Sequence, residues 1–439
     1  MKAQFKNIGR TLFSLLEKNE TASLRLTGED TLYIRYNSGK VRQNTQVHQY
    51  IVTLVYKNGK KVLSQEWSMG NDPIQSVEEA KKHLQSLREE AKNIADSPFE
   101  PEMVNHGSSD VDHEGHLPSF ETIFKDIEQA CAGTDFCGLF AGGKQVSATQ
   151  NSKGQFHWFS KESFFVDYSL YFGERAVKSY YAGSKWSGAA LQENIKKSSA
   201  HLEVMKQPQV NVKPGAYRVF LEPAAVAELL SYLTYSSFSL RSFKSGEGLL
   251  IDLAHQLKSL SPLLTIQENF ELGFVPSFNS LGEISPSKMS LIENGQLKNW
   301  LIATSTAQEF KTESNHASPG ESPRSLEILP GTLKKEDILT QLGTGLYLAN
   351  LHYVNASDQK SARLTGMTRF AAFWVENCKI VGPINNLRFD ETLYKAWGAN
   401  LIALTSEAEV IPDTSTYGAR ALSGNKLPGM LIDQFSFTL

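Results

Sequence analysis

Short runs rich in Val, Ile, Tyr and Phe, each ending at a glycine turn, dominate the first half of the chain. In residues 37–67 two such runs flank a turn at Gly59, which predicts a β-hairpin. Residues 151–181 repeat the pattern without a gap and place Gly173 in register with Gly59, and Tyr181 in register with Trp67. The pattern predicts a duplicated hairpin; the alternative is a chance likeness between two strand-rich stretches.

A helix is predicted after each hairpin, over residues 76–92 and 189–205. In both segments apolar residues recur at helical spacing. They are Val77, Ala80, Leu84, Leu87 and Ala91 in the first segment, and Leu191, Ile195 and Leu202 in the second. A hairpin with a single helix leaves an apolar face uncovered, so we expect the two copies to cover each other.

The amino-acid composition and the apolar periodicity of the chain change at two places outside these units. Residues 98–118 are rich in Pro, Gly, Ser, Asp and His and have no apolar periodicity, which predicts a linker or a long surface loop. A new region starts near Gly215, where residues 224–237 read as a helix with small apolar side chains and Pro223 at its start.

Beyond this helix, short β-like runs alternate with turns, as is typical of an antiparallel domain. The runs span residues 263–267, 289–295, 297–305, 368–384 and 429–439. One more helix is predicted after Lys334, with its end at Gly343. Residues 314–330 have the composition of an exposed loop.

Together these elements predict an α+β fold of antiparallel sheets with flanking helices, in which duplicated hairpin-helix units precede a strand-rich C-terminal domain. We expect an N-terminal α+β unit in residues 1–97, a linker in 98–118, a second α+β unit in 119–210 and the strand-rich domain in 211–439.

Composition and charge narrow the possible partners. Of the 439 residues, 41% are hydrophobic and 21% charged, which is ordinary for a globular protein. The formal net charge of −3 gives no basic surface for nucleic acid or an anionic membrane. No apolar run is long enough to span a membrane, and the start lacks the continuous apolar segment of a signal peptide. We therefore expect a cytoplasmic protein that binds neither nucleic acid nor membrane.

The most tempting metal motif is the run from Asp112 to His116, in which His113 and Glu114 are followed closely by a second His. A zinc peptidase helix needs its two His one helical turn apart, with the Glu beside the bound water. The spacing here does not meet that requirement, and the nearby Gly115 and Pro118 disfavour a helix. We therefore interpret the run as a polar loop, with His113 and His116 as weak candidate ligands.

Other reactive residues stand alone in the sequence. His255 lies among Leu and Ile residues, where a lone His is more often structural than a ligand. Cys131 and Cys137 fit no metal or redox spacing, and Cys378 lies at a predicted turn without a nearby base. Three cysteines in a reducing compartment do not predict disulfides.

Four stretches resemble the TldD/PmbA family of peptidase-like proteins. Residues 291–298, LIENGQLK, match a characteristic stretch of that family. Residues 217–230, 374–383 and 431–439 are similar to the start, a hairpin and the closing strand of its C-terminal domain. Residues 278–283, FNSLGE, depart from the acidic turn of the family. The likeness covers residues 217–439 directly, and the two N-terminal units by their shape and order.

The resemblance implies that zinc chemistry is missing. In that family the TldD-type subunit carries a His-Glu-x-x-x-His helix and a later Cys as zinc ligands, whereas the TldE/PmbA-type subunit lacks them. We expect the His helix between Leu240 and Leu260, where this sequence has no pair of His, and residues 421–426 have no Cys. The chain is therefore similar to the TldE/PmbA-type subunit, with no catalytic residues, metal or cofactor expected.

By resemblance, the chain would pair with a TldD-like catalytic subunit and enclose peptides for processing or degradation. One alternative is a homodimeric peptide-binding or regulatory protein. Another is an atypical metallopeptidase with ligands drawn from His113, His116, His255 and His316. The family also has an older name as a modulator of DNA gyrase, and the charge of the chain leads us to expect any such effect through proteolysis.

Overall fold

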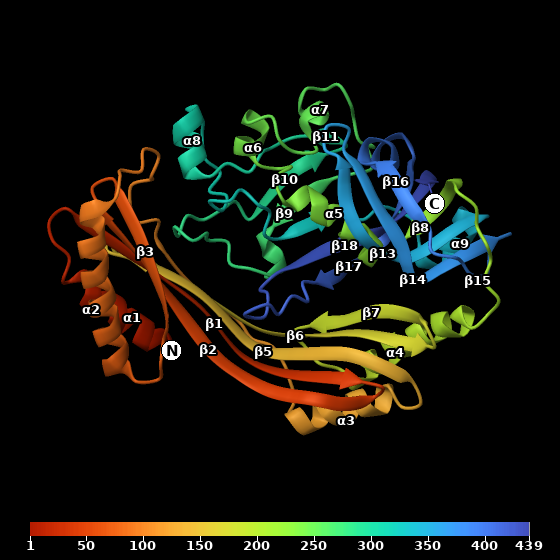
Figure 1. Ribbon diagram of the computed structural model, residues 1–439, viewed down its shortest axis with the longest axis horizontal. Helices are drawn as coiled ribbons and strands as arrows, with labels where there is room; N and C mark the ends of the chain where they lie inside the picture. Colours follow the sequence, from red (N-terminus) through yellow and green to blue (C-terminus); the bar gives the residue numbers. More distant parts are fainter. Residues whose placement is uncertain (439) are drawn as a thin grey trace.

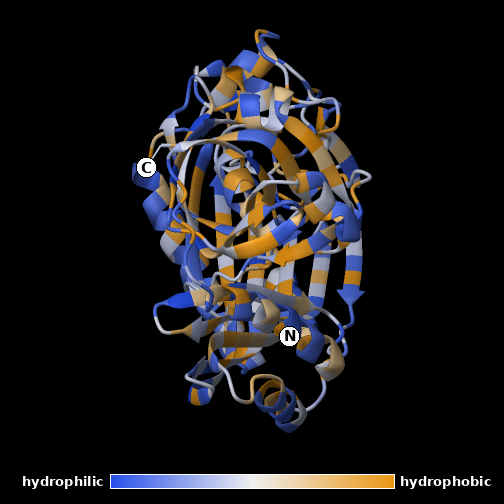
Figure 2. Ribbon diagram, turned by 90° about the vertical axis from the view of Figure 1, so that its right-hand side faces the viewer, coloured by the Kyte–Doolittle hydropathy of each residue, from blue (hydrophilic) through white to orange (hydrophobic). Residues whose placement is uncertain are grey.

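The computed structural model describes residues 1–438, which form two β-sheets with helices packed against them (Figure 1). The predicted α+β class is confirmed. In Figure 2 hydrophobic and hydrophilic residues alternate as bands along the strands, as expected where each strand has one buried face. Among the described residues, no helix is both long and apolar enough to cross a membrane.

The N-terminal half builds a seven-stranded sheet in the order β3-β2-β1-β5-β6-β4, with β7 also paired to β6. Its strands are β1 (Glu20–Asn37), β2 (Lys40–Asn58), β3 (Lys61–Ser68), β4 (Ser108–His113), β5 (Asp135–Asn151), β6 (Phe156–Phe172) and β7 (Arg175–Gly183). The two predicted hairpins are β2-β3 and β6-β7, with Gly59 and Gly173 at φ +59° and +60° in their turns. Each copy also has a long strand before its hairpin, which the sequence comparison missed.

The two copies lie edge to edge and do not stack. Strand β1 pairs antiparallel with β5 from Ser23 opposite Asn151 to Tyr36 opposite Gly138. Continuous main-chain hydrogen bonding therefore joins the copies, and helices cover their apolar face. The helices are α1 (Lys2–Phe13), α2 (Pro73–Glu90), α3 (Phe120–Ala130) and α4 (Gly188–Met205).

Alternate positions of the long strands separate an apolar face from a polar one. Even-numbered residues such as Leu24, Leu26 and Val52 are buried against α1 and α2, and Phe136 and Phe140 are in the cluster that includes α3 and α4. On β1 and β5 the odd-numbered positions are mostly polar, and residues 25, 27, 29, 145, 147 and 149 face loops of the C-terminal half. Figure 1 shows the concave side of the sheet turned toward that half. The sheet thus presents an enclosed polar surface to the second half of the chain.

Glu20 on β1 ties the sheet to α2. Its carboxylate accepts hydrogen bonds from Arg88 Nε and Nη2 at 2.8 and 2.6 Å, from the Glu17 N–H at 2.8 Å and from the Tyr56 hydroxyl at 2.5 Å. Burial alone would raise the pKa of Glu20, but these bonds outweigh it and lower the pKa from 4.5 to about 2.

A group whose pKa falls on folding contributes stability above its ordinary pKa and loses it as the pH drops toward the folded value. We therefore expect Glu20→Gln to cost about 1 kcal/mol of unfolding free energy at pH 6, and much less near pH 3. Urea unfolding at both pH values measures this difference. Glu89→Gln, an exposed change on the same helix, is the control. An equal cost at both pH values would contradict the assignment.

Residues 98–118, predicted as a linker, contain strand β4, which pairs parallel with β6. The strand has almost no apolar residues, so hydrophobic periodicity could not find it. Asp112 links β4 to β6, because the Asp112 carboxylate accepts a hydrogen bond from Trp158 Nε1 at 3.3 Å and another from the Ser160 hydroxyl. Polar contacts hold this edge of the sheet.

The C-terminal half builds an eleven-stranded sheet in the order β11-β10-β9-β12-β18-β16-β14-β13-β8, with β15 on β14 and β17 on β18. Its strands are β8 (Gly215–Leu221), β9 (Ile266–Asn269), β10 (Lys288–Glu293), β11 (Gln296–Leu297), β12 (Leu326–Ile328), β13 (Gly345–Asp358), β14 (Arg363–Glu376), β15 (Lys379–Pro383), β16 (Arg388–Thr392), β17 (Leu401–Pro412) and β18 (Gly424–Phe437). Strand β8 pairs parallel with β13 and antiparallel with β18, so the pairing closes on itself.

Helix α5 (Pro223–Thr234) occurs where it was predicted and buries Leu229, Leu230 and Leu233 in the core of this half. Helix α9 (Ile338–Leu342) ends at Gly343, also as predicted. The run 297–305 was predicted as β-like, but only Gln296–Leu297 forms a strand, and helix α8 (Thr304–Phe310) follows. Two short helices, α6 (Leu240–Lys244) and α7 (Ile251–Ala254), complete this half.

Residues 314–325 form a loop as predicted, but the predicted exposure is wrong for much of the segment 314–330. Glu321 is 2% exposed, and its carboxylate accepts hydrogen bonds from the Ser239 hydroxyl at 2.6 Å and from the Arg241 and Ala303 N–H groups at 3.0 and 2.8 Å. Strand β12 lies in the same segment. Polar residues of this segment form hydrogen bonds with buried main-chain groups. Composition alone does not distinguish such residues from polar residues that are exposed to solvent.

Candidate functional site

The polar face of the N-terminal sheet borders a cavity of about 570 Å³, here called the sheet cavity. Odd-numbered residues of β1, β2 and β5 form one wall, and loops of the C-terminal half form the other. The two walls include Arg25, Thr27, Glu29, Ile51, Ser147, Thr149, Val275, Phe278, Arg324 and Arg420. This volume is in the range of small-ligand sites.

The sheet cavity is rich in positive charge. Three arginines line it, Arg25, Arg324 and Arg420, and among its described lining residues Glu29 is the one carboxylate. Both oxygens of Glu29 are occupied, because Oε2 accepts from the Tyr33 hydroxyl at 2.7 Å and Oε1 from Gln49 at 2.6 Å. An anionic ligand would therefore find an excess of cations here.

Arg420 joins the two halves of the molecule. It is 4% exposed, and its guanidinium donates to the carbonyl oxygens of Ser163 at 2.6 Å, Gly143 at 2.8 Å and Ala141 at 3.4 Å. Its carbonyl accepts a hydrogen bond from Gln145 at 2.7 Å. Burial lowers the pKa of Arg420 to about 10, so it remains charged at neutral pH.

Arg324 holds the opposite wall. Its guanidinium donates to the carbonyl oxygens of Pro276, Ser277 and Phe278 at 3.2, 3.2 and 2.7 Å. The backbone N–H of Arg324 donates to the Glu268 carboxylate at 2.6 Å. Burial raises the pKa of Glu268 and lowers that of Arg324, and the charge of each opposes the shift of the other. The pair fixes residues 276–278 beside the sheet.

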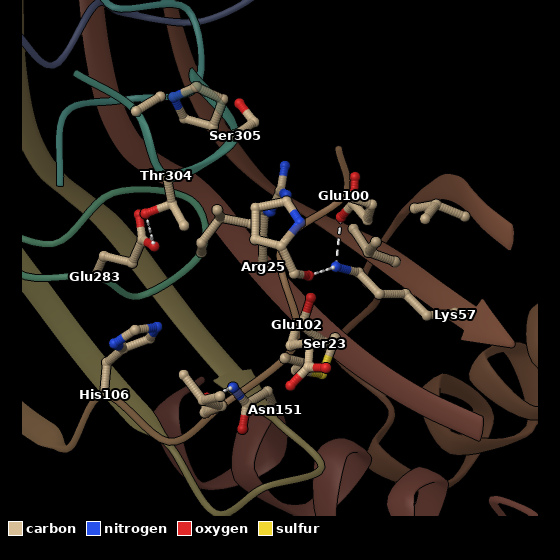
Figure 3. Close-up of a pocket in the computed structure, with 18 of the residues that line it drawn as sticks. Ser23, Arg25, Lys57, Glu100, Glu102, His106, Asn151, Glu283, Thr304 and Ser305 are labelled. Atoms are coloured by element: carbon tan, nitrogen blue, oxygen red, sulfur yellow. Dashed lines mark hydrogen bonds and ion pairs between the residues drawn. The ribbon is translucent and has the colours of Figure 1, made fainter. Parts of the chain in front are cut away.

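A second cavity of about 330 Å³ adjoins the first and shares Arg25 with it; we call it the Lys57 cavity (Figure 3). Lys57 forms an ion pair with Glu100 and donates to the Pro101 carbonyl at 2.8 Å. From the C-terminal half, the Thr304 hydroxyl donates to Glu283 at 2.5 Å. The figure draws Arg25 between these two pairs.

Several buried polar atoms on the concave face have no hydrogen-bond partner among the described residues. Arg25 Nε, Thr149 Oγ1 and His157 Nε2 are three of them. Arg25 is opposite Thr149 on β5, which is opposite His157 on β6, so the three form one row across the sheet. Because buried polar groups are normally paired, such a row indicates a surface made for a polar ligand or ordered water.

A third cavity of about 470 Å³, the helix cavity, lies between α5 and the chain around the start of β18. Glu228 and Ser231 face it from α5, and Asp413 and Ser423 from the other side. Residues 421–426 are where the resemblance implies a ligand Cys, and ligands of one ion must converge. Helix α5 is the helix that borders the same cavity as Ser423. The segment expected for the other ligands, 240–260, is fully described and lines no part of this cavity.

The helix cavity is lined by two carboxylates, Glu228 and Asp413, and by hydroxyl groups. Its described lining residues include neither an imidazole nor a thiolate, the groups that the resemblance implies for the zinc site of a TldD-type subunit. Within residues 1–438, no group of three or more His, Cys, Asp or Glu side chains is placed to hold a metal ion.

The candidate His ligands lie in separate environments. His113 ends β4 beside Phe159, and His116 forms a bridge with Lys185. His255 is exposed after α7 and packs against Phe243. His316 lies beside His106 in the segment that packs over residues 279–285. The structure does not bring them together as the ligand set of an atypical metallopeptidase.

The three cysteines also lie apart. Cys131 is buried, Cys137 is half-buried, and Cys378 is exposed in the β14-β15 turn. Sequence reasoning missed the three arginines of the sheet cavity. For Arg25 the signal was present, since it is a charged residue on the polar face of a strand whose neighbouring positions, Leu24 and Leu26, are apolar.

Comparisons with known proteins agree with this architecture. Residues 214–439 match the PmbA/TldA metallopeptidase C-terminal domain. The whole chain is similar in fold to TldE from Thermococcus kodakarensis, with 13% identity, TM-score 0.78 and coverage of 99% of this chain and 100% of that one. No curated protein sequence matches it.

Two further crystal structures are of proposed modulators of DNA gyrase. The one from Thermotoga maritima has 14% identity and TM-score 0.76, with coverage of 99% of this chain and 100% of that chain. The one from Bacteroides thetaiotaomicron has 14% identity and TM-score 0.74, with coverage of 100% and 98%. These structures establish the fold, and the domain match covers more than half of the residues. The chain therefore belongs to the TldD/PmbA family of metallopeptidase-like proteins.

Proposed function

We propose that this protein is the subunit without zinc ligands in a TldD/TldE-type peptidase assembly of the cytoplasm. Its partner would be a TldD-like chain that carries the His-Glu-x-x-x-His helix. In this assembly it would bind and enclose peptides that the partner cleaves. Peptides, and neither nucleic acid nor membranes, would be its ligands.

The observation that carries the proposal is the donor set of the helix cavity. Glu228, Ser231, Asp413 and Ser423 border a cavity of about 470 Å³ between a helix and the segment in which a ligand Cys is expected by resemblance. These side chains supply neither imidazole nor thiolate, so a tightly held catalytic zinc is disfavoured. The architecture of the family is retained around a cavity whose own chemistry is different.

A peptide-binding role is supported by the sheet cavity. It is a space of about 570 Å³ with an apolar loop wall and a polar strand wall that retains unpaired donors and acceptors. A peptide offers both a main chain with hydrogen-bonding groups and side chains for apolar contact. The cavity therefore matches the chemistry of a short peptide segment.

Native purification tests the assignment. We expect a tagged full-length chain, recovered from its own cells, to co-purify with a near-equal amount of a chain bearing the His-Glu-x-x-x-His motif. Elemental analysis should find zinc in the complex and none in the chain purified alone, and only the complex should cleave unfolded peptides. Recovery as a monomer or homodimer would overturn the partner-subunit role, and stoichiometric zinc with cleavage by the isolated chain would identify a peptidase.

A further inference from the structure

Arg25 stands out because its charge is not used inside the protein. It lies on β1 and is half-buried, yet no hydrogen bond or ion pair joins its guanidinium to any of residues 1–438, and Nε is fully enclosed. In Figure 3 no dashed line reaches it, although both neighbouring pairs are connected. A guanidinium has five N–H donors, so this is a costly arrangement for a protein without a ligand.

Among residues 1–438, three acidic side chains line the Lys57 cavity with Arg25: Glu100 and Glu283 are paired with other residues, and Glu102 forms no ion pair with Arg25. Glu100 acts on Arg25 only at a distance, since it lies beyond 4.0 Å and is paired with Lys57. Glu283 accepts from Asn279 at 2.7 Å as well as from Thr304. Burial lowers the pKa of Arg25, and Glu100 only partly opposes this shift. The guanidinium nevertheless stays protonated near neutrality.

The surroundings of Arg25 define what could pair with it. Hydroxyl groups of Thr27, Ser147 and Thr149 line the sheet cavity on neighbouring strand positions. The opposite wall presents apolar side chains, Val275 and Phe278 among them. A planar fork of N–H donors matches the two oxygens of a carboxylate, and the adjacent hydroxyls can donate to the same group.

Arg324 and Arg420 provide an internal comparison. Both line the same cavity, but their terminal nitrogens donate to main-chain carbonyl oxygens. Those two arginines are therefore part of the wall, although Arg420 Nε has no partner among residues 1–438. The terminal nitrogens of Arg25, by contrast, make no hydrogen bond within residues 1–438 and can pair with a bound molecule.

We propose that Arg25 binds the carboxylate of a peptide held in the sheet cavity, with the free C-terminal carboxylate as the preferred group. This inference rests on the proposed peptide-binding function and specifies its ligand: short peptides with an accessible carboxylate and an apolar residue beside it. An acidic side chain offers the same chemistry, so the test includes both sources.

The binding test uses a fluorescein-labelled tetrapeptide, Ala-Leu-Ala-Leu, as the free acid and as the C-terminal amide, with the full-length chain. Fluorescence anisotropy should show the amide binding at least about 10-fold more weakly, the loss typical of one charge-assisted contact. A third peptide, an amide with Glu at the last position, identifies the source of the carboxylate. Recovery of binding by this peptide would assign the site to any terminal acidic group.

Three variants locate the effect. Arg25→Met should abolish the difference between acid and amide, and Arg25→Lys should restore only part of it, because an ammonium cannot form the bidentate contact. Thr149→Val should weaken binding of the free acid less than Arg25→Met does. Arg35→Met, an exposed arginine on the same face of the same strand, is the matched control and should bind like the unmodified chain.

Stability separates a ligand anchor from a structural residue. If Arg25 serves a ligand, Arg25→Met should leave the melting temperature unchanged or higher, since an unpaired charge is removed. A lower melting temperature, or equal binding of acid and amide, would overturn the inference while leaving peptide binding intact. Failure of every peptide to bind would remove both the inference and the peptide-binding role.

Discussion

Replacing Arg420 by Ala is expected to lower the free energy of unfolding by about 3 kcal/mol, the largest effect among the substitutions considered. The change removes three hydrogen bonds to main-chain oxygens of the N-terminal sheet, at 2.6 to 3.4 Å, in a nearly inaccessible place. It also leaves Glu29 buried at 1% exposure without a neighbouring cation. Urea denaturation at neutral pH measures the loss.

The same substitution should loosen the chain that precedes β18. Hydrogen exchange is expected to accelerate in residues 413–423 and at the facing positions of β5, because Arg420 is the link between them. Arg42→Ala, an exposed arginine on β2, provides a control that should change neither measurement by more than about 0.5 kcal/mol. Unchanged exchange in that segment would show that Arg420 does not hold the two halves together.

Arg324→Ala is expected to lower the free energy of unfolding by about 2 to 3 kcal/mol and to change the shape of the sheet cavity as well. Its guanidinium supplies the donors for three successive carbonyl groups, Pro276 to Phe278, and lies over the Phe270 ring at 4.6 Å. Without it, Glu268 loses its nearest cation and those carbonyls lose their partners. Peptide binding should weaken together with stability.

That coupling distinguishes Arg324 from Arg25. A chemical denaturation series and the anisotropy titration on the same preparation should show both quantities falling for Arg324→Ala. For Arg25→Met only binding should fall. Arg369→Ala, an exposed arginine on β14, is the matched control. If Arg324→Ala kept full affinity at reduced stability, the loop at residues 276–278 would not be part of the binding wall.

The sequence predicted those parts of the fold whose signals are local. The two hairpins were found because glycine at a left-handed turn and alternating apolar positions act within about twenty residues. Helix α2 was predicted at 76–92 and occurs at Pro73–Glu90, where Asp72 caps its first turn through Ile74 N–H and Gln75 N–H. Edge strand β4 and the buried segment at residues 314–330 were missed because polar groups stabilise them.

The candidate site was harder to predict because its residues come from distant parts of the chain. The sheet cavity joins Arg25 on β1 to Arg324 and Arg420 in the C-terminal half, and only tertiary packing brings them together. The resemblance predicted the family, which the comparisons confirm, and the absence of zinc ligands, which stays a prediction. It also led us to expect the ligand helix at residues 240–260, whereas the helix that borders the same cavity as Ser423 is α5, a proximity that arises only from tertiary packing.

The way β18 pairs has a consequence for the order in which the molecule is built. All strand pairs of the first sheet lie between residues 20 and 183, so that sheet can complete itself while the chain is still being synthesised. The second sheet cannot, because β18 at residues 424–437 is the neighbour of β8, β12, β16 and β17. Arg420 is made just before it. The first sheet can therefore form before the C-terminal half is made, whereas the walls of the sheet cavity are complete only once Arg420 is present.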